Sequence, residues 1–92
     1  MLNFCRSGKI ITIDSGRFVI VSDINNIIID DSYLPYHDVI YIPCIHIDSD
    51  YTESIATFAI SSETKKVTII LYSGHIMITG WIRINGSYLA RN

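Results

Sequence analysis

Apolar residues along this chain come in short runs separated by clusters of turn-forming residues. Residues 8–13, 17–21, 39–48, 54–61 and 66–72 are rich in isoleucine, valine and aromatic side chains. Runs of this kind, bounded by Gly, Asn, Asp and Ser, are typical of β-strands. The chain has no apolar period of 3.6 residues long enough to indicate an amphipathic helix. The pattern therefore predicts an all-β chain with no substantial helix.

The turns between the runs predict which strands are neighbours. Residues 14–16 and residues 62–65 are small or polar and suit tight turns, so each is expected to close a hairpin between the runs on its two sides. Roughly eight short strands with turns every 8–12 residues have the spacing of a sandwich or barrel. We expect residues 1–92 to form one small antiparallel β-sandwich, jelly-roll-like in type. Its shorter strands are expected at residues 27–29, 75–79, 81–85 and 88–89.

Pro43 interrupts the longest of the runs, residues 39–48. Proline has no backbone N–H, so within sheets it is confined to edge strands, strand starts and bulges. We therefore expect a sheet edge or a bulge at Pro43, in a run that otherwise has the length and composition of a long strand.

The composition indicates that part of the apolar surface needs a partner. The chain has 92 residues, of which 49% are hydrophobic and 17% charged, and it contains twenty isoleucines and three alanines. A domain of this size buries about 60–65% of the surface of its unfolded chain, so a monomer leaves apolar surface in water. Large exposed apolar patches usually mark interfaces. We expect self-association or, as the alternative, cover by other parts of a longer chain.

Three of the runs, residues 17–21, 39–48 and 66–72, are apolar on both faces of the predicted strand. In these runs, large apolar side chains occupy consecutive positions instead of alternating with polar ones. An antiparallel strand with one face in water normally alternates. One face is therefore expected to pack inside the sandwich and the other against a neighbouring subunit.

Charge and hydropathy exclude two classes of partner. The chain has seven basic and nine acidic residues, a formal net charge of −2, whereas electrostatic binding of nucleic acid requires a basic excess. Its longest unbroken apolar runs, such as residues 18–21, are far shorter than the roughly 20 residues that a membrane-spanning helix needs. We expect no nucleic-acid partner and no membrane insertion.

The sequence has no recognisable catalytic motif. It contains no Gly-x-Ser-x-Gly element and no glycine-rich phosphate loop, so we predict no catalytic residues and no cofactor. His46, Asp48 and Asp50 would share one face of a continuing strand, but a structural metal site usually needs four ligands. A solvated strand face is the preferred interpretation, and no metal is predicted.

The two cysteines, Cys5 and Cys44, leave two possibilities open. They could pair as a disulfide, or they could stay reduced and behave as small apolar side chains. Isolated cysteines more often stay reduced, and this is the preferred interpretation.

The aromatic residues give the best candidates for ligand binding. Trp and Tyr present flat faces that stack on the apolar faces of sugars, together with a polar group. Arg83 lies two residues after Trp81 and shares its strand face. The alternative for Trp81 is a place in the core with Arg83 as its solvated neighbour, and for Trp81 this alternative is preferred. The candidate saccharide-binding residues are Trp81, Arg83, Tyr88, Tyr51 and Asp50.

Several segments together resemble a known family. A Tyr-Leu-Pro-Tyr segment leads into a strand that ends in proline over residues 33–44, and strand-like segments follow at residues 56–60 and 66–69. Residues 78–89 close with a Gly-Trp pair, a strand and the sequence Asn-Gly-Ser-Tyr-Leu, and residues 8–13 fit a first strand. In these features the chain resembles the C-terminal head, or receptor-binding, domains of phage tail-fibre and baseplate proteins.

The resemblance implies a function as well as a fold. It implies a β-sandwich, often a homotrimer, that binds host cell-surface carbohydrate without catalysis, is located in the virion and contacts other tail or baseplate proteins. Binding residues vary within the family, so the candidate residues above come from the aromatic argument alone. Two alternatives stay open: a purely structural β module that assembles a tail or baseplate, and a small β-sandwich enzyme.

Overall fold

The computed structural model describes residues 2–77 and 79–92, and this part of the chain is mainly β-structure. Met1 and Ile78 lie outside the described residues, so the strand predicted at residues 75–79 is described except at Ile78. The two short helical segments are α1 (Val21–Asn25) and the 3₁₀ turn η1 (Asp31–Tyr33). The described residues form the strands β1 (Asn3–Ser7), β2 (Ile10–Asp14), β3 (Val19–Ile20), β4 (Val39–Ile47), β5 (Glu53–Ser61), β6 (Val67–Leu71), β7 (Ile76–Met77), β8 (Trp81–Arg83) and β9 (Asn85–Leu89).

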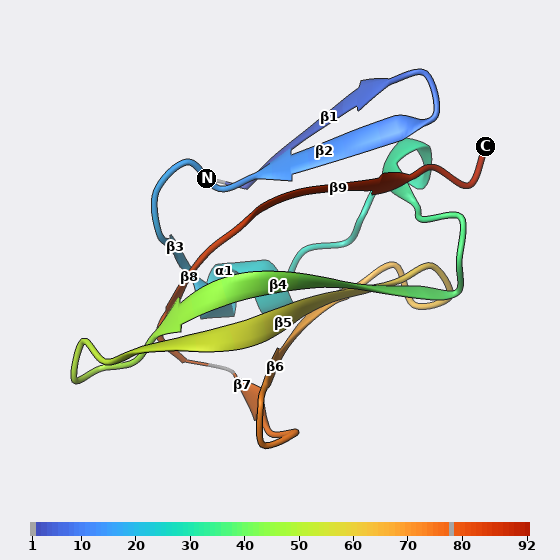
Figure 1. Cartoon of the computed structure of the whole chain (residues 1–92). Coiled ribbons are helices and arrows are strands. Elements are labelled where there is room, and N and C mark those ends of the chain that lie inside the picture. The colour runs from blue at the N-terminus through green and yellow to red at the C-terminus, as the bar shows by residue number, and fades with distance from the viewer. Residues whose placement is uncertain (1, 78) are drawn as a thin grey trace.

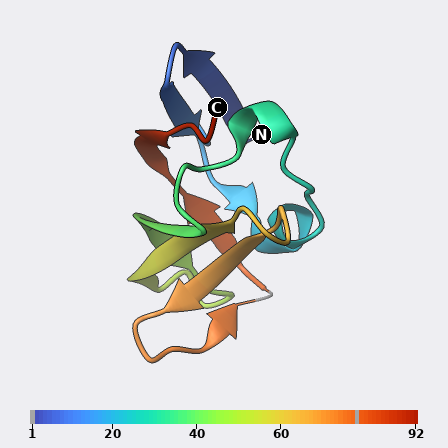
Figure 2. The same cartoon turned by 90° about the vertical axis from the view of Figure 1, so that its right-hand side faces the viewer.

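These strands form two antiparallel sheets, which confirms the all-β prediction. One sheet has the order β1-β2-β9, and the other has the order β3-β8-β4-β5-β6-β7 (Figure 1). The three-stranded sheet lies over one face of the six-stranded sheet, and α1 lies beside the gap between them (Figure 2). Because successive strand residues point to opposite faces, each strand sends alternate side chains into the space between the sheets. The largest fully buried apolar side chains there are Phe58, Ile11, Ile13, Ile24, Ile60, Ile69, Ile82 and Ile84.

The second predicted hairpin is confirmed, and the first is wrong. β5 and β6 pair as expected across the turn at residues 62–65. The first hairpin, however, joins β1 to β2 at Gly8, where φ is +60°. After β2 the chain crosses to the other sheet, where β3 pairs with β8. Residues 14–16 form a corner between sheets, because Ser15 is held by Ile84 rather than by a returning strand.

Three shorter predictions also need correction. Residues 21–25 form α1 in place of a strand end and loop, since Val21 and Ile24 both reach the core from one side of a single helical turn. Residues 27–29 form no strand, and only Ile28 makes an isolated bridge, to Lys66. The predicted strand 81–85 is divided between the two sheets, because β8 ends at Arg83 and β9 begins at Asn85. β9 is also longer than the predicted strand 88–89.

Pro43 lies on an edge, as predicted. β4 is continuous, and β5 pairs with all nine of its residues. On the other side of β4, β8 pairs only with Ile45, His46 and Ile47. The backbone at Pro43 therefore has no neighbouring strand on that side, and the missing N–H removes no ladder hydrogen bond there.

Gly80, just before β8, permits a close approach of the backbone to the end of β4. Its φ is +89°, and a Cβ added there would lie 2.4 Å from the Ile47 carbonyl oxygen and 2.6 Å from Nε2 of His46. His46 is buried, and its Nε2 is 3.0 Å from the Thr79 carbonyl oxygen. Any side chain at position 80 would press on both the strand backbone and this buried ring.

Replacing Gly80 with alanine should therefore destabilise the protein more than a similar change in open space. A left-handed backbone alone costs a residue with a Cβ about 1–2 kcal/mol. Adding the clash, we expect Gly80→Ala to lower the free energy of unfolding by about 2–4 kcal/mol in urea titrations. Gly74→Ala is the matched control, because Gly74 has φ of +87° and nothing within 4 Å of an added Cβ. Equal losses in the two variants would contradict the steric role of Gly80.

Candidate functional site

The face of the six-stranded sheet that points away from the three-stranded sheet is apolar and exposed; we call it the outer face. Strand pairing places its side chains in rows, because directly opposed residues share a face. Ile20, Trp81 and Ile47 are opposed in this way across β3, β8 and β4. Ile55 and Ile76 on this face are 74% and 62% exposed. Its main apolar side chains are Ile20, Tyr41, Ile45, Ile47, Ile55, Ile70, Ile76 and Trp81, with Tyr72 just beyond β6.

The outer face has the apolar composition of an interface and covers about half the area of one side of a standard interface. With strands about 4.8 Å apart and about 3.4 Å per residue, β8, β4, β5 and β6 have a footprint on the order of 400 Å². A standard interface buries about 800 Å² per partner, about twice this footprint. Within the described strands of this sheet, the outward charged side chains are Glu53 on β5 and Arg83 on β8, which flank β4 from opposite sides.

One end of the outer face carries two parallel aromatic rings. The carboxylate of Asp48 accepts hydrogen bonds from the N–H groups of Asp50 and Thr52, at 2.9 and 3.0 Å, and so holds the turn between β4 and β5. Tyr51, at φ of +60°, lies in this turn and is 80% exposed. Its ring is 6° from parallel to the ring of Trp81, with 6.3 Å between centroids. The turn thus presents a flat aromatic surface of the kind that packs on sugars or on apolar side chains.

Arg83 lies beside a cavity at the point where the chain leaves the six-stranded sheet. Its guanidinium carbon is 5.3 Å from the centroid of the Phe18 ring, a cation–π arrangement. The cavity has a volume of about 480 Å³, within the usual range of small-molecule sites. Its lining combines apolar side chains from the sheet with polar groups from the corner: Ile45, Ile55, Arg83, Asp14 and Asn85.

The structure brings together four of the five predicted binding residues. Asp50 and Tyr51 share the β4–β5 turn, and Trp81 and Arg83 share the outer face of β8. The preferred interpretation of Trp81 as a core residue is wrong: it is half-buried, while Ile82 next to it takes the core position.

Tyr88 does not belong to this group. It lies on β9, opposite Ile11, and is buried in the core. Its hydroxyl donates a hydrogen bond of 2.7 Å to the Tyr33 carbonyl oxygen, and burial raises the pKa of the phenol. The sequence placed Tyr88 near a strand end, but alternation along β9 directs it inward. Of the exposed residues Ile55, Tyr72 and Ile76, which the sequence analysis did not single out, only Tyr72 lies in a run predicted to be apolar on both faces.

The three residues considered as metal ligands do not converge. His46 is buried and faces Thr79, whereas β4 ends at Ile47, so Asp48 belongs to the turn and not to the strand face. Among residues 2–77 and 79–92, no group of three His, Cys, Asp or Glu side chains is placed to hold a metal ion.

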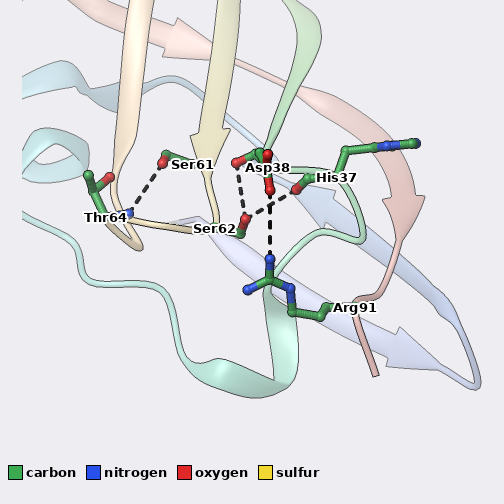
Figure 3. Close-up of polar contacts among 6 residues, drawn as sticks. All are labelled: His37, Asp38, Ser61, Ser62, Thr64 and Arg91. Carbon is green, nitrogen blue, oxygen red and sulfur yellow. Dashed lines mark hydrogen bonds and ion pairs between the residues drawn. The ribbon is translucent and has the colours of Figure 1, made fainter.

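A second polar cluster, at the opposite end of β4 and β5, is structural. The buried Ser62 donates through Oγ to the carbonyl oxygens of His37 and Asp38, at 3.2 and 3.1 Å (Figure 3). The His37 ring points away from this serine. Arg91 approaches Asp38 at 3.9 Å, and the N–H of Thr64 donates to the Ser61 hydroxyl at 3.2 Å. A serine whose proton is directed to carbonyl oxygens, with no base beside it, is not set up as a nucleophile.

No protein-family model, curated protein or solved structure matches this chain. In the described segments, neither helical element has the length and apolarity needed to cross a bilayer. Function is therefore inferred from the outer face, its aromatic end and the strand edges around it.

The two cysteines should differ in reactivity. Both are free thiols; Cys5 is exposed and Cys44 is buried, and burial raises the pKa of Cys44 from 9.0 to about 11. Because the thiolate is the reactive form, iodoacetamide at pH 8 should modify Cys5 in the native protein and Cys44 only after unfolding, as read by intact mass. Modification of both at similar rates would contradict this placement of Cys44.

The same pKa shift predicts a pH dependence of stability. Below about pH 9 the Cys44 thiol is protonated in both states; above it, the unfolded chain loses this proton first. The Cys44 contribution to stability is therefore complete below pH 9 and is lost as the pH rises toward about 11. Over this range the free energy of unfolding of the wild type, measured by urea titration, should fall relative to that of Cys44→Val. Parallel pH profiles of the two free energies would contradict the raised pKa of Cys44.

Proposed function

We propose that this chain is a non-catalytic β module that assembles with copies of itself through the outer face. The observation that carries the proposal is the exposure of adjacent isoleucine and aromatic side chains across β3 to β7. Covering one such side chain fully is worth about 1.5–3 kcal/mol, so a face of this size favours association. Contiguous apolar patches of a few hundred Å² on a protein surface are often functional.

A second copy of the chain suits this face better than a small ligand does. The face belongs to a sheet, and sheets pack well against other sheets, about 10 Å apart. Its charged side chains are complementary, so Arg83 of one copy can lie against Glu53 of the next. A contact between Arg83 of one copy and Glu53 of the next is compatible with a two-fold dimer. It is also compatible with a closed ring of three, which is the homotrimer predicted by the resemblance to phage head domains.

A second candidate function is binding of host carbohydrate by the aromatic end of the outer face. It is supported by the parallel rings of Tyr51 and Trp81, the neighbouring Arg83 and the cavity that Arg83 lines. It corresponds to the receptor-binding head of a phage tail fibre or baseplate, located in the virion. The proposed assembly module would belong in the same structures as a structural part.

Light scattering at micromolar protein concentration tests the assembly. Three copies of 10.4 kDa would give about 31 kDa, and a stable oligomer that is lost in the outer-face variant below supports the outer face as the contact. The double variant Ile55→Asp, Ile76→Asp should give a monomer, because it buries charges in the contact. Ile10→Asp is the matched control: Ile10 is exposed on β2, away from the outer face, and its loss should leave the mass unchanged. A monomeric wild type would overturn the proposal.

Binding to host cell-wall glycans tests the second candidate. Tyr51→Ala and Trp81→Ala should each weaken binding by about tenfold or more, because each removes one stacking face. Tyr36→Ala is the control, since Tyr36 is exposed but pairs edge-on with His37 and lies outside the outer face. Unchanged binding in both test variants would remove the candidate site. The oligomeric mass, measured on the same samples, separates loss of the ligand contact from loss of assembly.

A further inference from the structure

We propose that β4 carries a second contact between copies of this chain, distinct from the outer face: residues 39–43 form an open strand edge that pairs, antiparallel, with the same edge of a second copy. The partner is thus the β4 strand of an identical chain, with Tyr41 opposite Tyr41. The contact goes beyond the proposed outer-face assembly and does not depend on it.

The edge is open because the chain changes sheet beside it. β8 pairs with the last three residues of β4 only, and at Ile84 the chain departs to form β9 in the three-stranded sheet. From Val39 to Cys44, β4 is paired with β5 on one side and with no described strand on the other. Val39, Tyr41 and Pro43 are all exposed.

Hydrogen bonds at the two ends of β4 show which residues direct their backbone groups to this edge. The N–H of Ser62 donates to the Asp38 carbonyl oxygen at 2.8 Å, and the N–H of Asp48 donates to the Thr52 carbonyl oxygen at 3.2 Å. Both bonds join the β4 segment to the β5 side. Because backbone direction alternates along an antiparallel pair, even-numbered residues face β5. Val39, Tyr41 and Pro43 therefore face the open edge.

The position of Pro43 agrees with this assignment. It is the one β4 residue without an N–H, and it lies at an edge-facing position. The groups available on the edge are thus the N–H of Val39 and Tyr41 and the carbonyl oxygens of Val39, Tyr41 and Pro43. A row of donors and acceptors at every second residue matches another polypeptide strand.

β9 does not occupy this edge. Within the described residues β9 pairs with β2 and not with β4. Its even-numbered residues bond to the β2 side, as in the bond from the Ser15 N–H to the Ile84 carbonyl oxygen, and on its odd-numbered side Leu89 accepts a hydrogen bond from the N–H of Tyr36. Between β9 and the β4 edge lies an open cavity of about 410 Å³. The cavity is lined from both strands, with Val39, Ile40, Tyr41 and Ile42 on one side and Ser87, Tyr88 and Leu89 on the other.

The β4 edge is complementary to itself. With Tyr41 opposite Tyr41, the two tyrosines exchange N–H and carbonyl hydrogen bonds, and the N–H of each Val39 meets the carbonyl oxygen of the opposite Pro43. Every N–H on both edges is then used, and the missing N–H of Pro43 leaves only the Val39 carbonyl oxygens to water. A shift toward Ile45 would collide with β8, which already pairs there.

Such a pair would place the outer faces of two copies side by side in one extended sheet. Tyr41 is 65% exposed on that face, and each Tyr41 would gain the other as a cross-strand neighbour. A few backbone hydrogen bonds give only modest net affinity. The contact is therefore best tested by covalent trapping and at millimolar protein concentration.

Disulfide trapping tests the register. In a Cys5→Ser background that also carries Ile55→Asp and Ile76→Asp, which remove the outer-face contact, Tyr41→Cys should form a symmetric disulfide dimer on mild oxidation. Opposed residues of a hydrogen-bonded pair have Cα atoms about 5.5 Å apart, within disulfide range. Thr57→Cys is the control: Thr57 is outward on β5, opposite Pro43, but β4 and β6 pair on both of its sides. The Tyr41→Cys variant should cross-link at least about tenfold faster than the Thr57→Cys variant. Equal rates would overturn the proposal.

Amide exchange tests the hydrogen bonds themselves. The N–H groups of Val39 and Tyr41 should exchange at least about tenfold more slowly at millimolar than at micromolar concentration. Tyr41→Pro should abolish this protection at Val39, because it removes the N–H of residue 41 from the shared edge. Pro43 shows that β4 accepts proline at an odd-numbered, edge-facing position. Tyr41→Ala removes the same ring but keeps the N–H, and should retain protection.

The outcomes separate the two contacts. Protection at Val39 that is independent of concentration in the wild type would overturn the edge contact, whether or not Tyr41→Pro folds. Trapping of the Tyr41→Cys variant together with a monomeric wild type at micromolar concentration would support the edge and remove the outer-face assembly. An oligomeric wild type together with no trapping of the Tyr41→Cys variant would support the outer-face assembly and remove the edge contact.

Discussion

Three hydrogen bonds between Ser15 and Ile84 fix the point at which the two sheets are joined. The Ser15 N–H and hydroxyl both donate to the Ile84 carbonyl oxygen, and the Ile84 N–H donates to the Ser15 hydroxyl. Ser15 is buried, so these groups have no water to replace the bonds if they break. The anchor makes the chain leave the six-stranded sheet after Arg83. This departure leaves β4 without its second neighbour and opens the two cavities between β4 and β9.

The many isoleucines serve two different surfaces. Those that face the three-stranded sheet, such as Ile60 and Ile69, are fully buried and hold the layers together. Those on the other side, such as Ile55 and Ile76, stay in water in the isolated chain. A sheet that is apolar on both faces is stable only when both faces are covered. In the proposed assembly, the same strands would supply both the core and the contact.

Local patterns predicted the strands better than their partners. The runs that became β4, β5 and β6, and the edge position of Pro43, followed from composition and proline chemistry. The corner at residues 14–16 was mistaken for a hairpin because both use Gly and small polar residues, and only the distant Ile84 distinguishes them. In the candidate site, alternation placed Trp81 and Arg83 together. The contact of Tyr51 with Trp81 depends on a turn between strands, which periodicity does not describe.

The pairing of β2 with β9 also has a consequence for the order of folding. β4, β5 and β6 are consecutive along the chain and can pair as soon as they are synthesised, whereas Ile11 meets Tyr88 only when nearly the whole chain is available. Loop closure over such a separation is slow compared with hairpin formation. During synthesis the central strands therefore expose both apolar faces, and the core-facing side stays uncovered until the closing strand β9 is available.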